Sequence, residues 1–477
     1  MNETCDVLLP GELYRSLVKH LFPGDNEEHG AVIAVGIVKS ARGVRLLGQR
    51  VFYARDGIDY VAGGRGHRQL RAEFIADCIE YCRANALGYL AVHNHAGDLH
   101  VGFSETDRAS HERGYPTLLG LLDGPPVGAL VFAARAAAGE LWFAGGQRCT
   151  VRSVRAVGSV VHHLLPEPPM TRATAAAYDR QVLMFSDAGQ QRLADCKVTV
   201  VGLGGVGSLL VEPLARLGVG TLMLIDPDRV ELSNLSRLAG ATLWDARWPF
   251  STATMPTWVR NVAQKCAARK TTLAARVARR ANPACRIIPV SRNVAELTVA
   301  GECRDCDFLF LAADSMQARL VVNALCQQYL IPGLQVGSKV VTTHDDRVLE
   351  DAYSVVRWLL PGRGCLWCNG LISPERLAWE AKTQGERHAQ QYGIDAPSPS
   401  VITLNAVGAA HAAAMFMTGY LGLYGEADSS DYRFRHLHRE SIQDYPRRDA
   451  ACPECGDQGR MARGDGLALP TLFTRKS

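Results

Sequence analysis

Residues 197–228, KVTVVGLGGVGSLLVEPLARLGVGTLMLIDPD, constrain the fold of this chain more than any other segment. An apolar run is followed by a glycine-rich turn, an amphipathic segment and a second apolar run. This order is typical of a β-strand, a tight turn, an α-helix and a second β-strand. Two strands joined through a helix lie parallel in one sheet. We therefore expect an α/β fold with a Rossmann-like domain.

The glycine-rich turn predicts a phosphate site. Gly202, Gly204 and Gly207 follow the pattern GxGxxG, with Gly205 inside it. Bare backbone amides and a helix N-terminus can together hold a phosphate group. Asp226 ends the next apolar run, where a carboxylate would bind a ribose hydroxyl. Up to this point an NAD enzyme and an ATP enzyme explain the pattern equally well.

The length and composition indicate a globular protein of two domains. A chain of 477 residues is too long for one ordinary core. The formal charge of +4 is nearly balanced, so we expect neither nucleic acid nor a membrane as partner. The start has no basic segment followed by an apolar run, so we expect a cytoplasmic protein. The apolar stretch near residue 406 carries a histidine and suits a packed helix.

The pattern before residue 160 predicts a second, mixed α/β domain. Apolar and alternating runs predict β-strands, and residues 69–84 predict an amphipathic helix. Residues 162–177 concentrate Pro, Thr and Ala and mark a boundary. The expected strands lie at 30–38, 45–53, 88–92 and 128–133, with a hairpin across 139–155. The expected divisions are a domain at 1–160, a linker at 161–176, a domain at 177–460 and a C-terminal tail at 461–477.

The segment HNHAGDLHVGFSETD predicts a metal site in the first domain. It follows the expected strand GYLAV, so His93 and His95 project to the same side of a strand end. Asp107 lies twelve residues beyond His95, with Ser104 shortly before it. Two imidazoles and a carboxylate leave a fourth tetrahedral position for water on zinc. The simpler alternative is a hydrogen-bonded loop that binds no metal.

The spacing His-x-His followed by Ser-x-x-Asp resembles the JAMM (also called MPN or Mov34) zinc metallopeptidases. The resemblance covers roughly residues 10–150, and these enzymes cleave ubiquitin-like proteins from their attachments. It implies a catalytic zinc ion bound by His93, His95 and Asp107. One departure is Ala96, which stands where the family has a proline that is not a ligand.

The same resemblance implies roles for two further residues. In EEHGAVIAVG, Glu27 stands three residues before Gly30 at the family's general-base position, with Glu28 as the neighbouring competitor. Ser104 would stabilise the tetrahedral oxyanion. We expect His100 and His111 on the surface. A catalytically silent relative that keeps the fold is the alternative.

Motifs around the glycine-rich turn resemble the activating enzymes of the MoeB, ThiF and HesA type over roughly residues 176–460. These motifs are YDRQV, IDPDRVELSNLSR, FLAADSMQAR and a lysine followed by a helix that ends in Asn-Pro. Such enzymes use ATP and magnesium to adenylate the C-terminal glycine of a ubiquitin-like or sulfur-carrier protein. The resemblance implies that Asp226 binds ribose, that Asp314 binds magnesium, that Arg180 acts across a homodimer, and that the triphosphate is bound by Asn234, Arg237 and Lys270.

The cationic residues Arg237 and Lys270 distinguish the hypothesis of an ATP-dependent activating enzyme from that of an NAD enzyme. Attack of a carboxylate on a phosphate needs the negative charge of both partners neutralised. The alternative is that Arg237 and Lys270 are solvated surface residues that bind no phosphate. Two departures from the family are Leu238, where the family has Gln, and an inserted loop of unknown purpose around residues 242–258.

Two CxxC pairs predict a structural zinc site. Cys365 and Cys368 lie in GCLWCNG, and Cys452 and Cys455 lie in ACPECG. Each pair can place two thiolates on one metal, and the resembled family has the same two pairs. A third pair, Cys303 and Cys306, lacks a local partner pair, and we expect loop cysteines there. Cys78 and Cys82 lie one helical turn apart and are expected in the core.

No cysteine lies between the two zinc-binding pairs, where many activating enzymes form a thioester. Ser398 or Ser400 occupies about that place. Either the reaction stops at the adenylate, which we favour, or a serine accepts the acyl group as an ester. A serine needs a neighbouring base to act as a nucleophile, and Ser-Pro pairs are ordinary in turns.

The two resemblances together predict a bifunctional enzyme. It would process and activate one small carrier protein in a bacterial ubiquitin-like conjugation pathway, the bacterial origin being suggested by the fusion alone. A downstream conjugating enzyme is an expected further partner. The alternatives are activation of a sulfur carrier for cofactor biosynthesis, a scaffold that only binds a carrier, and an NAD dehydrogenase.

Overall fold

The computed structural model describes residues 4–25, 27–61, 68–343, 348–382, 399–423 and 430–472. The chain forms two compact units. The first comprises Met1–Met170 with Gln327–Leu330 and Arg460–Ala468, and the second comprises Thr171–Cys326, Ile331–Gly459 and Leu469–Ser477. The division between Met170 and Thr171 falls within the segment expected as a linker.

The first unit is built on an eight-stranded sheet in the order β1-β3-β2-β4-β5-β6-β7-β8. β1 also pairs with β7, so the sheet curves back on itself. The strands are β1 (Thr4–Pro10), β2 (Gly30–Ser40), β3 (Gly43–Tyr53), β4 (Gly88–Asn94), β5 (Val127–Phe132), β6 (Ala137–Trp142), β7 (Arg148–Val157) and β8 (His162–Leu164). All the predicted strands of this unit are present, and β8 lies inside the segment expected as linker.

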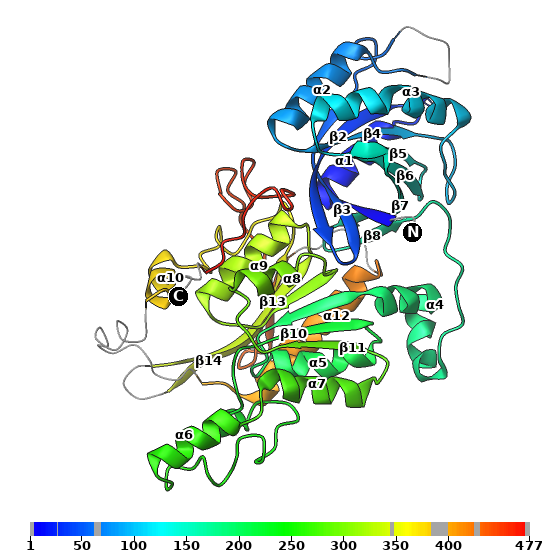
Figure 1. Ribbon diagram of the computed structural model, residues 1–477. Coiled ribbons are helices and arrows are strands. Elements are labelled where there is room, and N and C mark those ends of the chain that lie inside the picture. The colour runs from blue at the N-terminus through cyan, green and yellow to red at the C-terminus, as the bar shows by residue number, and fades with distance from the viewer. Residues whose placement is uncertain are drawn as a thin grey trace. The chain divides into compact units, whose positions relative to one another are not determined.

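Three helices cover this sheet, and its two faces pack in separate clusters. α1 (Gly11–Leu21) places Leu17 and Leu21 in one cluster, on one face of the sheet. α2 (Ala72–Ala84) and α3 (Glu105–Leu122) pack on the other face, as Figure 1 shows. Cys78 and Cys82 are buried in this second cluster, which confirms the prediction that they are core residues. Because both faces are covered, β2 is almost continuously apolar.

The second unit has a sheet in the order β11-β10-β9-β12-β13-β14-β15-β16. The strands from β11 to β13 are parallel and the remaining pairs are antiparallel. The strands are β9 (Lys197–Val201), β10 (Thr221–Ile225), β11 (Arg286–Val290), β12 (Phe308–Leu311), β13 (Gly333–Thr342), β14 (Leu349–Leu359), β15 (Asp431–Arg435) and β16 (Glu440–Asp444). This is the expected Rossmann-like α/β arrangement.

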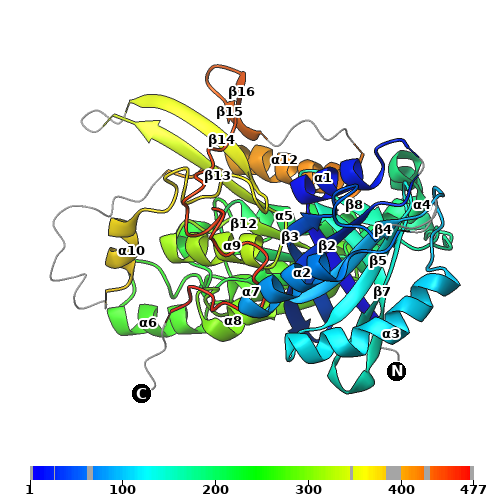
Figure 2. The same cartoon turned by 90° about the horizontal axis from the view of Figure 1, so that it is seen from above.

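Helices lie on both sides of this parallel sheet. Figure 1 shows α8 and α9 on one side and α5 and α7 on the other, and Figure 2 gives the view from above. The helices are α4 (Asp179–Asp195), α5 (Gly207–Arg216), α6 (Thr257–Cys266), α7 (Lys270–Ala281), α8 (Leu297–Glu302), α9 (Met316–Gln328), α10 (Pro374–Glu380) and α12 (Ile402–Tyr420). The apolar stretch near residue 406 is α12, which packs on α5, β13 and β14 as predicted. Among the described helices, none has the length and apolar character needed to cross a membrane.

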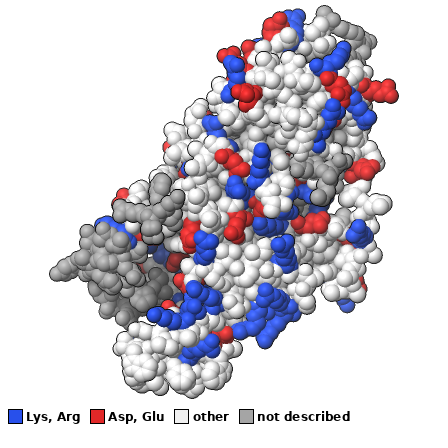
Figure 3. Space-filling model, viewed as in Figure 1, with Lys and Arg blue, Asp and Glu red and all other residues white. Residues whose placement is uncertain are grey.

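The insertion between Arg237 and Lys270 forms turns followed by α6. Asp245 anchors it through ion pairs with Arg276, 2.8 Å between Oδ2 and Nη2. Several large apolar side chains of the insertion are exposed: Leu243, Trp244, Trp248, Phe250, Trp258 and Val262. Figure 3 shows an uncharged surface at α6 with Lys and Arg side chains beside it.

Phe416 of α12 tests this packing. Its ring is fully buried, 4.8 Å from the Phe308 ring and 5.8 Å from the Phe310 ring between centroids. We expect Phe416→Ala to lower the free energy of unfolding of the second unit by about 3–5 kcal/mol, because it removes a fully buried ring and leaves a cavity. Urea denaturation followed by circular dichroism measures this change. Val407→Ala on an exposed part of the same helix is the control, and an equal loss in both variants would contradict the assignment.

Candidate functional site

The second unit has a cavity of about 940 Å³ at the carboxyl ends of its parallel strands. Gly202, Gly204 and Gly205 line it, together with Asp226 at the end of β10 and Asp314 after β12. β10 and β12 lie on opposite sides of β9, so the cavity occupies the point where the strand order reverses. Ligands bind at this point in open α/β sheets.

The glycine-rich turn is packed too closely for side chains. A Cβ atom on Gly207 would lie 1.8 Å from the Gly202 carbonyl oxygen. One on Gly202, whose φ is +88°, would lie 2.6 Å from the Ala313 nitrogen. At Gly204 a Cβ would meet no atom within 4 Å, since this residue faces the open cavity. The turn therefore brings bare backbone to the cavity wall and the start of α5 close behind it.

Asp226 holds this turn in place. Its Oδ2 accepts a hydrogen bond from the Leu203 backbone N–H at 2.7 Å, and its Oδ1 accepts one from Asp228 at 2.8 Å. Burial raises the pKa of the Asp226 carboxyl, and the nearby Lys270 ammonium opposes that rise. Lys270 Nζ lies 3.8 Å from Asp226 Oδ1 and 2.7 Å from Asp228 Oδ2, and these two carboxylates line the cavity.

Three arginines face the same cavity. The sequence predicted Arg237, and the structure adds Arg319 from α9 and Arg376 from α10. Arg319 ends the motif FLAADSMQAR, so its signal was present in the sequence without a role attached to it. Arg376 belongs to none of the motifs recognised in the sequence, and only the fold brings it to the cavity.

Four predicted nucleotide residues are not among the residues that line the cavity: Gly207, Asn234, Lys270 and Arg180. Gly207 supports the turn from behind, and Asn234 is buried, with its Oδ1 accepting from the Glu231 N–H at 3.3 Å. Arg180 is exposed on α4. Leu238, at the position where a Gln was expected, is buried in a small apolar cluster with Val230 and Leu273.

Ser400 lines the nucleotide-type cavity. Its Oγ accepts a hydrogen bond from Asn405 Nδ2 at 3.1 Å. An amide donor orients the hydroxyl but does not deprotonate it, so the contact supplies no base. Ser398 lies outside the described residues.

The four predicted zinc cysteines lie together in the second unit. Their sulfur atoms are 3.8 Å apart between Cys365 and Cys368, 3.8 Å between Cys365 and Cys452, and 3.5 Å between Cys368 and Cys455. Sulfur atoms at the corners of a tetrahedron around zinc lie about 3.8 Å apart, given Zn–S bonds of about 2.3 Å. Hydrogen bonding with Cys455 lowers the pKa of Cys365, and a lowered pKa favours the thiolate that binds metals. The donor set therefore fits zinc.

Cys303 and Cys306 show no such arrangement. Both are buried, and they belong to neither of the two metal-compatible groups found in the described part of the chain. They end α8 and precede β12, in the loop where they were expected.

In the first unit, His93, His95 and Asp107 converge at the end of β4 and the start of α3. The two histidine Nε2 atoms are 3.2 Å apart, and the Asp107 oxygens lie 3.5 Å from His93 Nε2 and 3.4 Å from His95 Nε2. Nitrogen and oxygen donors around a tetrahedral zinc ion lie about 3.3 Å apart. Burial alone would raise the pKa of the Asp107 carboxyl, but hydrogen bonds from His93 and His95 hold it well below its usual value. These three donors also fit zinc.

The structure favours Glu28 over Glu27 as the carboxylate beside this cluster. Glu28 Oε1 lies 3.7 Å from His95 Nε2, and Glu28 lines a cavity of about 230 Å³ that also contains His93 and Asp107. Glu27 contributes backbone contacts, with its N–H donating to Asp25 Oδ1 at 3.0 Å. Both glutamates precede β2, so strand alternation does not fix their directions and the sequence could not separate them.

Ser104 supports the Asp107 carboxylate. It is the N-cap of α3, and its Oγ donates to Asp107 Oδ2 at 2.8 Å while accepting from the Asp107 N–H at 3.1 Å. His100 is exposed as expected. The prediction that His111 is a surface residue was wrong: it is buried, its Nδ1 lies 2.8 Å from Glu140 Oε1, and its ring stacks on Tyr115. A buried imidazole needs a hydrogen-bond partner inside the protein, and Glu140 supplies it for His111.

The chain is similar to known adenylyltransferases. It is 29% identical over 284 residues to the sulfur carrier protein ThiS adenylyltransferase of Escherichia coli (strain K12), which covers 58% of this chain and 94% of that protein. It is 29% identical to ubiquitin-like modifier-activating enzyme 5 of Drosophila persimilis, over 37% of this chain and 42% of that protein. It is 31% identical to adenylyltransferase and sulfurtransferase MOCS3 of Sus scrofa, over 35% of this chain and 32% of that protein. The chain thus spans less than half of the two eukaryotic relatives.

Among solved structures, E. coli MccB with ATP matches 60% of this chain and 75% of its own, with a TM-score of 0.43 and 20% identity. The sequence model of the ThiF family matches residues 178–452, which is more than half of the 477 residues and includes the glycine-rich turn, the cavity and the four-cysteine cluster. The chain therefore belongs to the ThiF family.

Proposed function

We propose that the second unit uses ATP to adenylate the C-terminal glycine of a ubiquitin-like or sulfur-carrier protein. The observation that carries this proposal is the single cavity that joins the glycine-rich turn, Asp226, Asp314 and three arginines. A nicotinamide enzyme has no need for a cluster of phosphate-binding cations beside an acidic residue. Two relatives, a sulfur carrier protein adenylyltransferase and a ubiquitin-like modifier-activating enzyme, support the same chemistry by their names.

In this reaction a carboxylate oxygen of the carrier attacks the α-phosphorus of ATP, and pyrophosphate leaves. Both partners are negatively charged, so Arg237, Arg319 and Arg376 would reduce their repulsion as the new bond forms. Asp226 would bind the ribose, and the bare amides from Gly202 to Gly205 would bind phosphate oxygens. Asp314 would hold magnesium, which when bound neutralises part of the phosphate charge. Arg180 from a second copy of the chain would complete the site.

Asp314→Ala tests the adenylation proposal. We expect it to abolish ATP–pyrophosphate exchange in the presence of a carrier that ends in glycine, because the magnesium carboxylate is lost while the cavity walls remain. The gain of an AMP mass on the carrier, read by intact mass spectrometry, is the second readout. Glu212→Ala, an exposed acidic residue of α5 paired with Arg216, is the control and should keep full exchange. Unchanged exchange in Asp314→Ala would overturn the assignment.

We propose further that the first unit is a zinc peptidase that cleaves at the C-terminus of the same kind of carrier. His93, His95 and Asp107 would hold the metal, since their donor distances suit a tetrahedral ion. Zinc, when bound, supplies Lewis acidity for amide hydrolysis. Glu28 is the carboxylate within reach to take a proton from the attacking water and pass it to the leaving amine. Ser104 is the N-cap of α3 and donates a hydrogen bond to Asp107. It would also stabilise the tetrahedral oxyanion.

The two neighbouring glutamates give a sharp test of the peptidase. We expect Glu28→Gln to lower kcat for removal of a short extension from the carrier by about 10²–10⁴-fold while zinc content stays at the wild-type level. Glu27→Gln should keep activity within a few-fold, because its carboxylate does not line the site. Cleavage is followed by intact mass and zinc by elemental analysis. A large loss of activity in Glu27→Gln with full activity in Glu28→Gln would identify Glu27 as the general base. His93→Ala should lose both activity and zinc.

We propose that the four-cysteine cluster binds a structural zinc ion. Cys365→Ser should lower bound zinc and the thermal stability of the second unit, because the remaining thiolates no longer complete a tetrahedral site. Cys303→Ser, a buried cysteine outside the cluster, is the control and should keep zinc content unchanged. Zinc content equal in both variants and in the wild type would exclude a metal at the cluster.

Joined in one chain, the two activities would act in sequence on one carrier. The peptidase would expose the terminal glycine, or release the carrier from a target, and the second unit would adenylate that terminus for a conjugating enzyme. This is a processing and activating role in a ubiquitin-like conjugation pathway. Sulfur-carrier activation for cofactor biosynthesis is the second candidate, favoured by the 94% coverage of the ThiS adenylyltransferase. A binding scaffold would be the outcome if zinc and ATP bind but the carrier mass never changes.

A further inference from the structure

The backbone pairing between β2 and β4 ends at Gly30, two residues after Glu28 in the sequence. Its last pair is Gly30 with His93, in antiparallel register. The next pair would be His29 with Asn94, the residue between the two metal-ligand histidines. At this position the side chain of Asn94, and not its backbone, makes the hydrogen bonds between the two segments. Its Oδ1 accepts the His29 N–H at 2.6 Å, and its Nδ2 donates to the Glu27 carbonyl oxygen at 3.2 Å.

These two hydrogen bonds lie on either side of Glu28. Asn94 is 7% exposed, so water competes little for them. A carboxamide is the side chain that can satisfy both partners, because it has one accepting and one donating atom. An aspartate in its place could accept from His29 but would set a second carboxylate oxygen against the Glu27 carbonyl. Alanine or serine would not reach across the residue between them.

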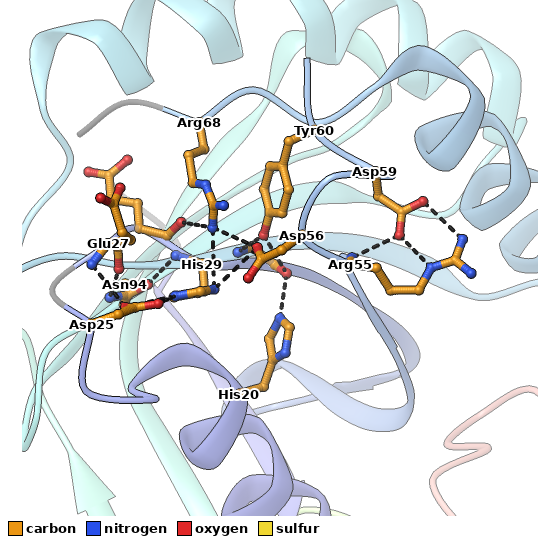
Figure 4. A network of polar contacts seen from close by, with 12 residues as sticks. His20, Asp25, Glu27, His29, Arg55, Asp56, Asp59, Tyr60, Arg68 and Asn94 are labelled. Atoms are coloured by element: carbon orange, nitrogen blue, oxygen red, sulfur yellow. Dashed lines mark hydrogen bonds and ion pairs between the residues drawn. The ribbon is translucent and has the colours of Figure 1, made fainter. Parts of the chain in front are cut away.

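Other contacts fix the same short segment, as Figure 4 shows. Arg68 Nη1 donates to the Glu28 carbonyl oxygen at 3.3 Å and pairs with Asp56 at 2.8 Å. The Tyr60 hydroxyl accepts the Gly30 N–H at 2.7 Å, and Arg68 lies over the Tyr60 ring. His29 Nε2 lies 3.0 Å from Asp25. Of these contacts, only those of Asn94 join the Glu28 segment to the strand end that carries His93 and His95.

We propose that Asn94 is a positioning residue that sets the distance between the Glu28 carboxylate and the metal-ligand cluster. The proposal rests on the peptidase function proposed for the first unit. The Glu28 carboxylate lies 3.7 Å from His95 Nε2, and its backbone is held from the residue directly before His95. Movement of the ligand strand end therefore carries Glu28 with it. A base displaced by about 1 Å loses roughly 10²-fold in rate.

A double-mutant cycle between Asn94 and Glu28 tests this coupling. We expect Asn94→Ala and Asn94→Asp each to lower kcat for carrier cleavage by about 10–100-fold, with KM and zinc content unchanged. In the Glu28→Gln background, Asn94→Ala should have little further effect, since the group that it positions is already inactive. Single-turnover cleavage with enzyme in excess gives the rate for the wild type, the three single variants and the double variant. Asn85→Ala, whose Nδ2 donates to Tyr81 at the end of α2, is the control and should behave as wild type.

Three results would overturn the proposal. A loss of zinc in Asn94→Ala would show that Asn94 supports the ligands and not Glu28. An equal fold loss with and without the Glu28 carboxylate would show that it acts by another route. Crystal structures of zinc-loaded wild type and Asn94→Ala add a readout that needs no substrate, with the Glu28 carboxylate expected to move away from the cluster in the variant. If no carrier is cleaved by the wild type, the peptidase function fails, while an unmoved Glu28 would overturn the positioning role by itself.

Discussion

The close approach of the glycine-rich turn to the backbone that follows β12 underlies the cavity of the second unit. The Gly207 and Gly202 backbones touch, and Gly202 lies against the Ala313 backbone at the end of β12. This contact places the glycine-rich turn and Asp314 at the same cavity. Asp226 then fixes the turn, because its carboxylate accepts backbone hydrogen bonds from Leu203 and Asp228.

In the first unit, side-chain hydrogen bonds hold the residues of the site in position. Its metal-compatible donors come from a strand end and a helix start, and each needs a support that fixes its direction. The Ser104 cap does this for Asp107, and the Asn94 carboxamide links the histidine strand to the Glu28 segment. Such supports keep reacting groups within a fraction of an ångström of their working positions. The two units thus place their sites at strand ends by different means.

Much of this arrangement could be predicted from the sequence, and the failures are local. The βαβ unit, the strands of the first unit, α12 and the core positions of Cys78 and Cys82 follow from hydrophobic periodicity, which the structure confirms. The wrong surface placement of His111 and the choice between Glu27 and Glu28, which stays a prediction, both concern side-chain direction. No periodic pattern governs a residue in a loop before a strand, and a lone histidine on a helix carries too little signal to show what packs on it.

The sequence by itself determined the fold class of the ThiF-family half and the residue types of both clusters, because motif spacing and strand periodicity are properties of neighbouring residues. Tertiary structure alone decided which distant residues share a cavity. It brought Arg319 and Arg376 to the glycine-rich turn and turned Glu28 toward His95. The physical reason is that side-chain direction and long-range proximity depend on packing between elements, which no local pattern contains.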